Sequence, residues 1–170
     1  MVATVEICES NGSSETITHN VGNLNCGDTE AANLDYTAYP IPQGENAYAK
    51  NARMHWSAGT ANKLDNFQVY KSAGAYKTGE GIQASLHTTQ GNYDTVKVTV
   101  YVQGTKTTYT AYAIPEADPG AANLGIGGSL TGNLVAVGYS DYLKFQLQTT
   151  GSTPQGDLNT KTITFQYDEQ

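Results

Sequence analysis

Short segments with strictly alternating side chains are the feature that most constrains how this chain can fold. In residues 96–102 four valines occupy every second position, and Lys97, Thr99 and Tyr101 fill the positions between them. A β-strand turns successive side chains to opposite faces, so this pattern gives one apolar face and one polar face. A helix would spread the same valines around its circumference. Residues 96–102 are therefore predicted to form a half-buried strand.

Similar segments recur along the chain and are separated by turn residues. The expected strands are residues 4–8, 16–18, 48–56, 66–70, 82–86, 96–102, 107–114, 134–137, 141–148 and 161–167. Short strands at this spacing, without a sustained helical period, predict an all-β fold with a single β-sandwich or jelly-roll-like domain. The length of 170 residues suits one such domain with its own core.

Two long segments interrupt the strand pattern. Residues 20–46 read as an irregular N-terminal loop or arm, stiffened by Pro40 and Pro42, with at most a turn of helix over residues 31–34. Residues 115–132 form a second loop, rich in Gly and Ala. A loop as long as the first is either functional or lies on another surface.

The charge balance excludes one class of partner. The net charge is −7 and the chain has a single arginine, Arg53, so we expect no nucleic-acid partner. Only 15% of residues are charged, and such a surface favours contact with other subunits or with protein or sugar surfaces, although a solvated extracellular β-protein has the same composition. Residues 1–8 alternate and lack the apolar region of a signal peptide, and no apolar run suits a membrane span, so we expect no membrane partner.

The two cysteines allow two interpretations. Cys8 and Cys26 either form a disulfide that joins the first strand to the arm, or remain buried thiols that pack as small hydrophobic groups. A zinc site built from Cys8, His19 and Cys26 lacks a fourth ligand and any short paired spacing. The sequence therefore predicts no metal and no cofactor.

Other polar residues give weaker signals. Asp28, Glu30 and Asp35 lie in the arm and offer carboxylate oxygens for a calcium ion, but their spacing matches no EF-hand. The chain has three histidines, with no shared metal spacing between them: His19, His55 and His87. No serine lies in a Gly-x-Ser-x-Gly elbow, and no catalytic residues are predicted.

Tyrosines are the most suggestive set, because exposed tyrosine is a typical anchor of protein interfaces. Tyr101 and Tyr142 are predicted to face outward, unless a second sheet covers that face. The candidate interface residues, at the level of sequence, are Tyr101, Tyr109, Tyr112, Tyr142, Pro40 and Pro42.

Three stretches carry a family resemblance: VATVEICESNG at the start, NVGNLNCGDTEAANLDYTAYPIPQGENAYAKNARMHW across the arm, and SDYLKFQLQTT with ITFQYDEQ near the end. The chain resembles the small β-sandwich virion structural proteins of tailed bacteriophages, in particular the capsid decoration or cement class. The resemblance is one of overall texture and carries no functional residue across. It implies a non-enzymatic homotrimer on the capsid surface, assembled in the host cytoplasm, that binds and stabilises the major capsid protein shell.

Two alternatives remain open at this level. The same texture occurs in phage tail and fibre components. A carbohydrate-binding module would use Trp56 and surface tyrosines as sugar platforms, although the alternation of residues 48–56 places Trp56 on a face expected to be buried.

Overall fold

All named secondary-structure elements in the described part of the chain are β-strands. The computed structural model describes residues 2–86, 98–156 and 159–170. The strands are β1 (Ala3–Asn11), β2 (Thr16–Thr18), β3 (Lys50–Gly59), β4 (Leu64–Ala73), β5 (Gly81–Ala84), β6 (Tyr112–Ala113), β7 (Gly138–Tyr139), β8 (Leu143–Gln148) and β9 (Thr162–Glu169). The predicted all-β class is confirmed.

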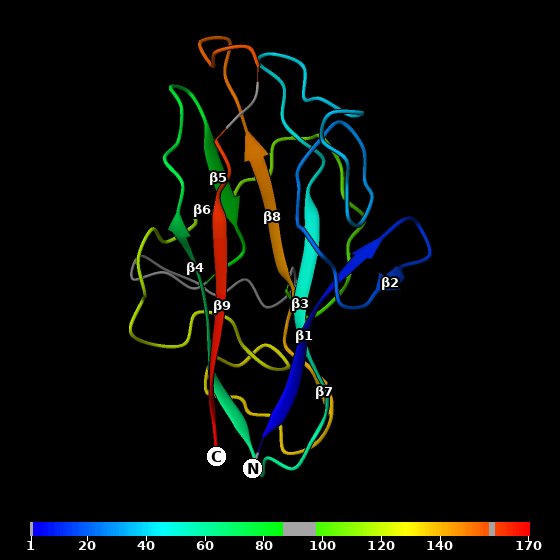
Figure 1. The fold of residues 1–170 in the computed structure, drawn as a ribbon, viewed down its shortest axis with the longest axis vertical. Helices are drawn as coiled ribbons and strands as arrows, with labels where there is room; N and C mark the ends of the chain where they lie inside the picture. Colours follow the sequence, from blue (N-terminus) through cyan, green and yellow to red (C-terminus); the bar gives the residue numbers. More distant parts are fainter. Residues whose placement is uncertain (1, 87–97, 157–158) are drawn as a thin grey trace.

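The strands form two antiparallel sheets. The larger sheet has the order β2-β1-β3-β8-β5-β6, with β7 also paired to β3, and the smaller sheet consists of β4 and β9. Both termini lie at the same end of the molecule (Figure 1). There the backbone N–H of Ala3 in the larger sheet donates to Glu169 Oε2 in the smaller sheet, at 2.9 Å.

One hydrophobic core joins the two sheets. Its central side chains come from the larger sheet (Met54, Trp56, Ile82, Ala84, Leu143, Phe145) and from the smaller sheet (Leu64, Phe67, Val69). Trp56 is 3% exposed, and its indole N–H donates to the Ala58 carbonyl at 2.8 Å. The buried face predicted for residues 48–56 is therefore confirmed, and Trp56 is inaccessible as a sugar platform.

The arm, residues 20–46, contains no strand but is held by its own hydrogen bonds. Asn33 has a φ of 51°, and its side-chain Oδ1 accepts from the backbone N–H of Gly22 at 2.6 Å. Leu34 is buried so tightly against Gly27 that a Cβ on this glycine would lie 2.5 Å from Leu34 Cδ2. Residues 31–34 form a turn without the predicted helix. The arm is thus an ordered loop of the free domain.

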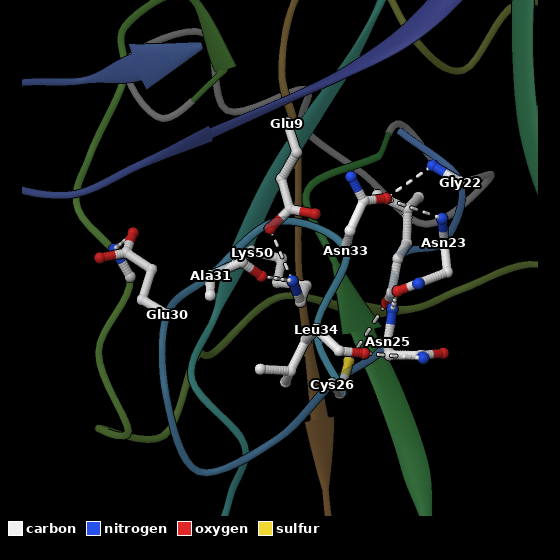
Figure 2. A network of polar contacts seen from close by, with 12 residues as sticks. Glu9, Gly22, Asn23, Asn25, Cys26, Glu30, Ala31, Asn33, Leu34 and Lys50 are labelled. Atoms are coloured by element: carbon white, nitrogen blue, oxygen red, sulfur yellow. Dashed lines mark hydrogen bonds and ion pairs between the residues drawn. The ribbon is translucent and has the colours of Figure 1, made fainter. Parts of the chain in front are cut away.

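A buried ion pair fastens the arm to the larger sheet. Lys50 Nζ lies 2.6 Å from Glu9 Oε1, and both side chains are fully buried. The same ammonium donates to the Ala31 carbonyl in the arm at 2.7 Å (Figure 2). Burial raises the pKa of Glu9 above its ordinary value, and the charge of Lys50 opposes this shift.

The predicted valine strand is wrong where the structure describes it. Residues 96 and 97 lie outside the described part, and residues 98–102 belong to no strand. Val98 is fully buried, whereas Val100 and Val102 are 51% and 43% exposed. A side chain from another segment forms a hydrogen bond with the backbone here, since Asn51 Nδ2 donates to the Val102 carbonyl at 3.1 Å. Alternation alone does not supply the neighbouring strand that a ladder needs.

Two further strand predictions are only partly correct. Of residues 107–114 only Tyr112–Ala113 form a strand, β6. The strand expected over residues 134–137 lies later in the chain as β7, and Leu134 makes a single bridge to Leu64. The loop at residues 115–132 lacks a named strand, as predicted.

Replacing Lys50 tests the buried ion pair. Lys50→Met leaves the Glu9 carboxylate buried without its cation, so the free energy of unfolding should fall by about 3–5 kcal/mol, measured by urea denaturation. The double variant Glu9→Leu with Lys50→Met removes both charges and should recover most of that loss. A double variant no more stable than the single one would show that the pair itself does not govern this site.

Candidate functional site

The register between β1 and β3 gathers four potential metal ligands on the outer face of the larger sheet. Glu6 and Cys8 lie two residues apart on β1, so they share the face opposite to the core-facing side chains. Glu6 pairs directly with His55 of β3 in the antiparallel ladder. His19 follows the end of β2, which is the neighbour of β1 on its other side.

The ligand atoms converge closely. Nδ1 of His19 and Nδ1 of His55 each lie 2.7 Å from Glu6 Oε1. Cys8 Sγ lies 3.3 Å from His19 Nδ1 and 3.8 Å from Glu6 Oε1. One ligand atom from each of the four residues lies within 4.8 Å of every other. We call these four residues the β1–β3 cluster.

Aromatic and cationic neighbours orient the cluster. The His55 ring stacks on Tyr139 of β7, its cross-strand partner, with 4.1 Å between ring centroids and 12° between planes. The Arg53 guanidinium carbon lies 3.9 Å from the Tyr139 ring centroid. The His19 ring meets the His55 ring edge-on at 5.1 Å. His55 is therefore held in one orientation by packing.

The local electrostatics differ across the cluster. Hydrogen bonds from His55 and then His19 lower the pKa of Glu6 below its ordinary value. Burial, followed by the charge of Glu6, raises the pKa of the Cys8 thiol to about 11. Cys8 is fully buried, whereas the His19 side chain is 46% exposed. The cluster thus has a buried thiol at its base and an imidazole open to solvent.

This geometry does not fit a Cys-His-Glu catalytic triad. In a triad the nucleophile and the orienting acid bind different nitrogens of one histidine. Here Cys8 Sγ and Glu6 Oε1 both contact Nδ1 of His19. A buried thiol with a raised pKa is also a poor nucleophile. Convergence of four ligand atoms on one point is instead what metal coordination requires.

Of the three residues considered for zinc in the sequence, the structure brings two together. Cys8 and His19 meet, as the weak zinc pattern requires, but Cys26 is absent from the cluster and His55 and Glu6 complete it. His87 lies outside the described residues. Sequence reasoning missed Glu6 and His55 because their proximity depends on the β1–β3 register. The signal in the sequence was that Glu6 and His55 each lie between two core-facing residues of a strand, which places both on the outer face of the sheet.

The disulfide considered for Cys8 and Cys26 does not form, and both residues are free thiols. Cys8 belongs to the outer face of the larger sheet, whereas Cys26 packs against the hydrophobic core. The two cysteines therefore lie on opposite sides of the sheet, which a bond between their sulfur atoms cannot bridge.

The three arm acids considered for calcium bind different partners. Asp28 pairs with Lys106 at 2.5 Å. Glu30 Oε1 accepts from the Gly104 N–H at 2.8 Å, and Asp35 accepts from the Thr37 hydroxyl at 2.6 Å. Among the described residues only the β1–β3 cluster groups three or more potential metal ligands of this kind.

Most of the proposed interface tyrosines are internal. Tyr142 and Tyr109 are buried, at 4% and 9% exposure, so the expectation that Tyr142 faces outward is wrong. The Tyr142 hydroxyl donates to Glu15, and the Tyr101 hydroxyl lies 2.9 Å from both Glu30 Oε1 and the Gly12 carbonyl. Tyr112 is half-buried in β6. Tyr142 thus attaches the β1–β2 hairpin to the domain, and Tyr101 attaches both the hairpin and the arm.

Among the described residues, the exposed large aromatic side chains lie instead at the tip of the arm. Residues 35–40 are all exposed, with Tyr36 at 48% and Tyr39 at 49%, and Pro42 is exposed as well. The arm and β9 also enclose an open groove of about 880 Å³, lined among others by Tyr36, Pro40 and Phe165. Sequence reasoning missed the two tyrosines, because no alternation marks exposure in an irregular loop.

No family model, curated protein or solved structure matches this chain. No helix in the described residues is both long and apolar enough to cross a membrane.

Thiol counting distinguishes the free cysteines from a disulfide. Burial raises the pKa of both thiols to about 11, so both should react slowly with a disulfide reagent in the native protein. Unfolded without reductant, the chain should show two reactive thiols. A count of zero would contradict the structure.

The raised thiol pKa also predicts an alkaline loss of stability. As pH rises above about 8.5 the unfolded thiols ionise while the folded thiols stay protonated, so the free energy of unfolding should fall between that pH and about 11. Cys26→Ala should show a smaller fall over the same range, and an identical fall would exclude this thiol as a cause.

Two matched substitutions test the placement of the tyrosines. Tyr142→Asp removes a buried ring and puts a second carboxylate beside Glu15, and should lower the melting temperature sharply, because a buried charge next to a like charge costs several kcal/mol. Tyr36→Asp, at the exposed arm tip, should melt close to the unmodified protein. Equal melting temperatures for the two variants would show that Tyr142 is accessible.

Proposed function

We propose that this chain is a non-enzymatic structural protein of a virion, a capsid decoration or cement protein that binds the major capsid protein as a homotrimer. The resemblance to the phage decoration class supports this function, as does an all-β domain with a sandwich-like arrangement of two sheets. The observation that carries the proposal is the arm tip, where two exposed tyrosines lie on a loop that is already ordered.

The arm tip has the composition of an interface. Tyr36 and Tyr39 offer large rigid surfaces with polar ends, and the exposed prolines next to them restrict the backbone. Exposed large hydrophobic residues of the described chain all lie outside the strands: Val2, Tyr36, Tyr39, Val100, Val102, Val135 and Val137. Adhesive surface is thus concentrated on loops, and the arm holds the aromatic part of it.

The groove beside the arm tip extends the same face. Its walls come from the arm and from β9, and its apolar lining includes Ile41 and Ile163. Strand β9 pairs only with β4 among the named strands. An extended segment of a coat protein fits such a groove, with side chains in the apolar lining and backbone near the β9 edge. Three copies on a threefold axis would engage three segments at once.

Cosedimentation with empty shells of the coat protein from the same source tests this function. Tyr36→Ser with Tyr39→Ser should weaken shell binding by about tenfold or more, since truncating an interface tyrosine costs at least about 1 kcal/mol. Val135→Ser with Val137→Ser alters residues outside the arm that are more exposed than the two tyrosines, and this variant should bind normally. Whole-arm deletion is a poorer test, because Lys50 would lose its Ala31 acceptor.

Sedimentation equilibrium of the free protein completes the test. A trimer that binds shells through the arm supports the proposal in full. A monomer without affinity for shells, or a protein retained on polysaccharides, would overturn it in favour of the tail-component or carbohydrate-binding alternative.

A further inference from the structure

We propose that the β1–β3 cluster is a binding site for a divalent transition metal of the zinc type, with Glu6, Cys8, His19 and His55 as its four protein ligands. Two imidazole nitrogens, one sulfur and one carboxylate oxygen form a mixed set that suits zinc. The inference is independent of the proposed function, because the cluster and the arm tip share no residue.

Four of the six distances between ligand atoms of the cluster are close to those of a tetrahedral site, and all six lie within 4.8 Å. Zinc bonds of about 2.0–2.3 Å place tetrahedral ligand atoms about 3.3–3.8 Å apart. Cys8 Sγ already lies 3.3 Å from His19 Nδ1 and 3.8 Å from Glu6 Oε1. The 2.7 Å contacts from Glu6 Oε1 to the two histidines are hydrogen bonds, which must open by less than about 1 Å to admit the ion.

Charge and proton balance also fit a divalent cation. The Glu6 carboxylate and the Cys8 thiolate together neutralise two positive charges, so the complex carries no net charge in its partly buried position. Binding converts the Cys8 thiol to a thiolate and releases its proton to solvent. Without the metal, each neutral histidine donates its Nδ1 proton to the Glu6 carboxylate. Binding therefore requires this proton to leave Nδ1 and another to be taken up from solvent on Nε2, so each imidazole stays neutral and Nδ1 is free to bind the metal.

The surroundings provide both rigidity and access. Tyr139 holds the His55 ring by stacking, which serves the role of an outer-shell contact that orients a ligand. The half-exposed His19 gives the ion a path from solvent to the buried thiol. Because its ligands come from β1, from β3 and from the residue that precedes the arm, the bound metal would fasten three segments to one another.

Isothermal titration of the reduced full chain with Zn²⁺ tests the site. We expect one ion per chain, a higher melting temperature with zinc, and an observed enthalpy that varies with the buffer because a proton is released. His55→Ala and Cys8→Ala should each weaken binding by more than about 100-fold, since loss of even an outer-shell contact costs 10- to 100-fold. Cys26→Ala removes the other thiol and should bind zinc normally.

Cobalt substitution gives a readout that does not depend on the folding of any variant. Co²⁺ added to the unmodified protein should produce the intense visible bands of a tetrahedral complex and a thiolate charge-transfer band in the near ultraviolet. A weak octahedral spectrum without the thiolate band would overturn the proposal, as would the absence of zinc binding. Loss of binding in Cys26→Ala, with Cys8→Ala unaffected, would also overturn it.

Discussion

The antiparallel register between β1 and β3 is the constraint on which the rest of the structure depends. It sets Val5 opposite Trp56 and Ile7 opposite Met54 on the inner face, where the core forms. On the outer face the same register sets Glu6 opposite His55. A shift of one residue would exchange the two faces of a strand, so it would bury the charged cluster and expose the core residues. The core therefore enforces the geometry of the cluster.

The inner face also explains how a long irregular segment stays ordered. Glu9 continues the core-facing row of β1, and Lys50 continues that of β3, so a charge from each strand is brought to the same buried end. Such a pair is stable only with good geometry and further hydrogen bonds. The Ala31 carbonyl of the arm supplies one of these bonds. Arm and sheet thus stabilise each other. Loss of Lys50 would leave the Glu9 carboxylate buried without its cation, and loss of the Ala31 carbonyl would leave the Lys50 ammonium without one of its acceptors.

Most of the strands were predictable, because alternation is a local property. Strand β2 occupies the predicted residues 16–18, and β8 and β9 lie within two residues of their expected limits. The prediction failed at residues 98–102. A strand needs a neighbouring strand as its hydrogen-bond partner, and here the Asn51 side chain binds the Val102 carbonyl instead. The metal ligands were not predictable from spacing, since Glu6 and His55 are 49 residues apart and meet only through the ladder. The burial of Tyr142, which lies just before β8, was not predictable either. It depends on the β1–β2 hairpin, where Glu15 accepts the hydrogen bond of the Tyr142 hydroxyl.

An ordered arm changes how the proposed attachment would gain its affinity. A segment that is disordered in the free protein loses conformational entropy when it binds, and this loss weakens the complex. Here the loss has already occurred on folding, through the Asn33 side chain, the close contact of Leu34 with Gly27 and the bond from the Asp28 N–H to the Tyr39 carbonyl. Tyr39 is itself part of that last bond, so its ring projects from a fixed backbone. Contact made by the exposed rings can then contribute to affinity almost in full, which suits a protein that must bind a preformed shell at several equivalent points.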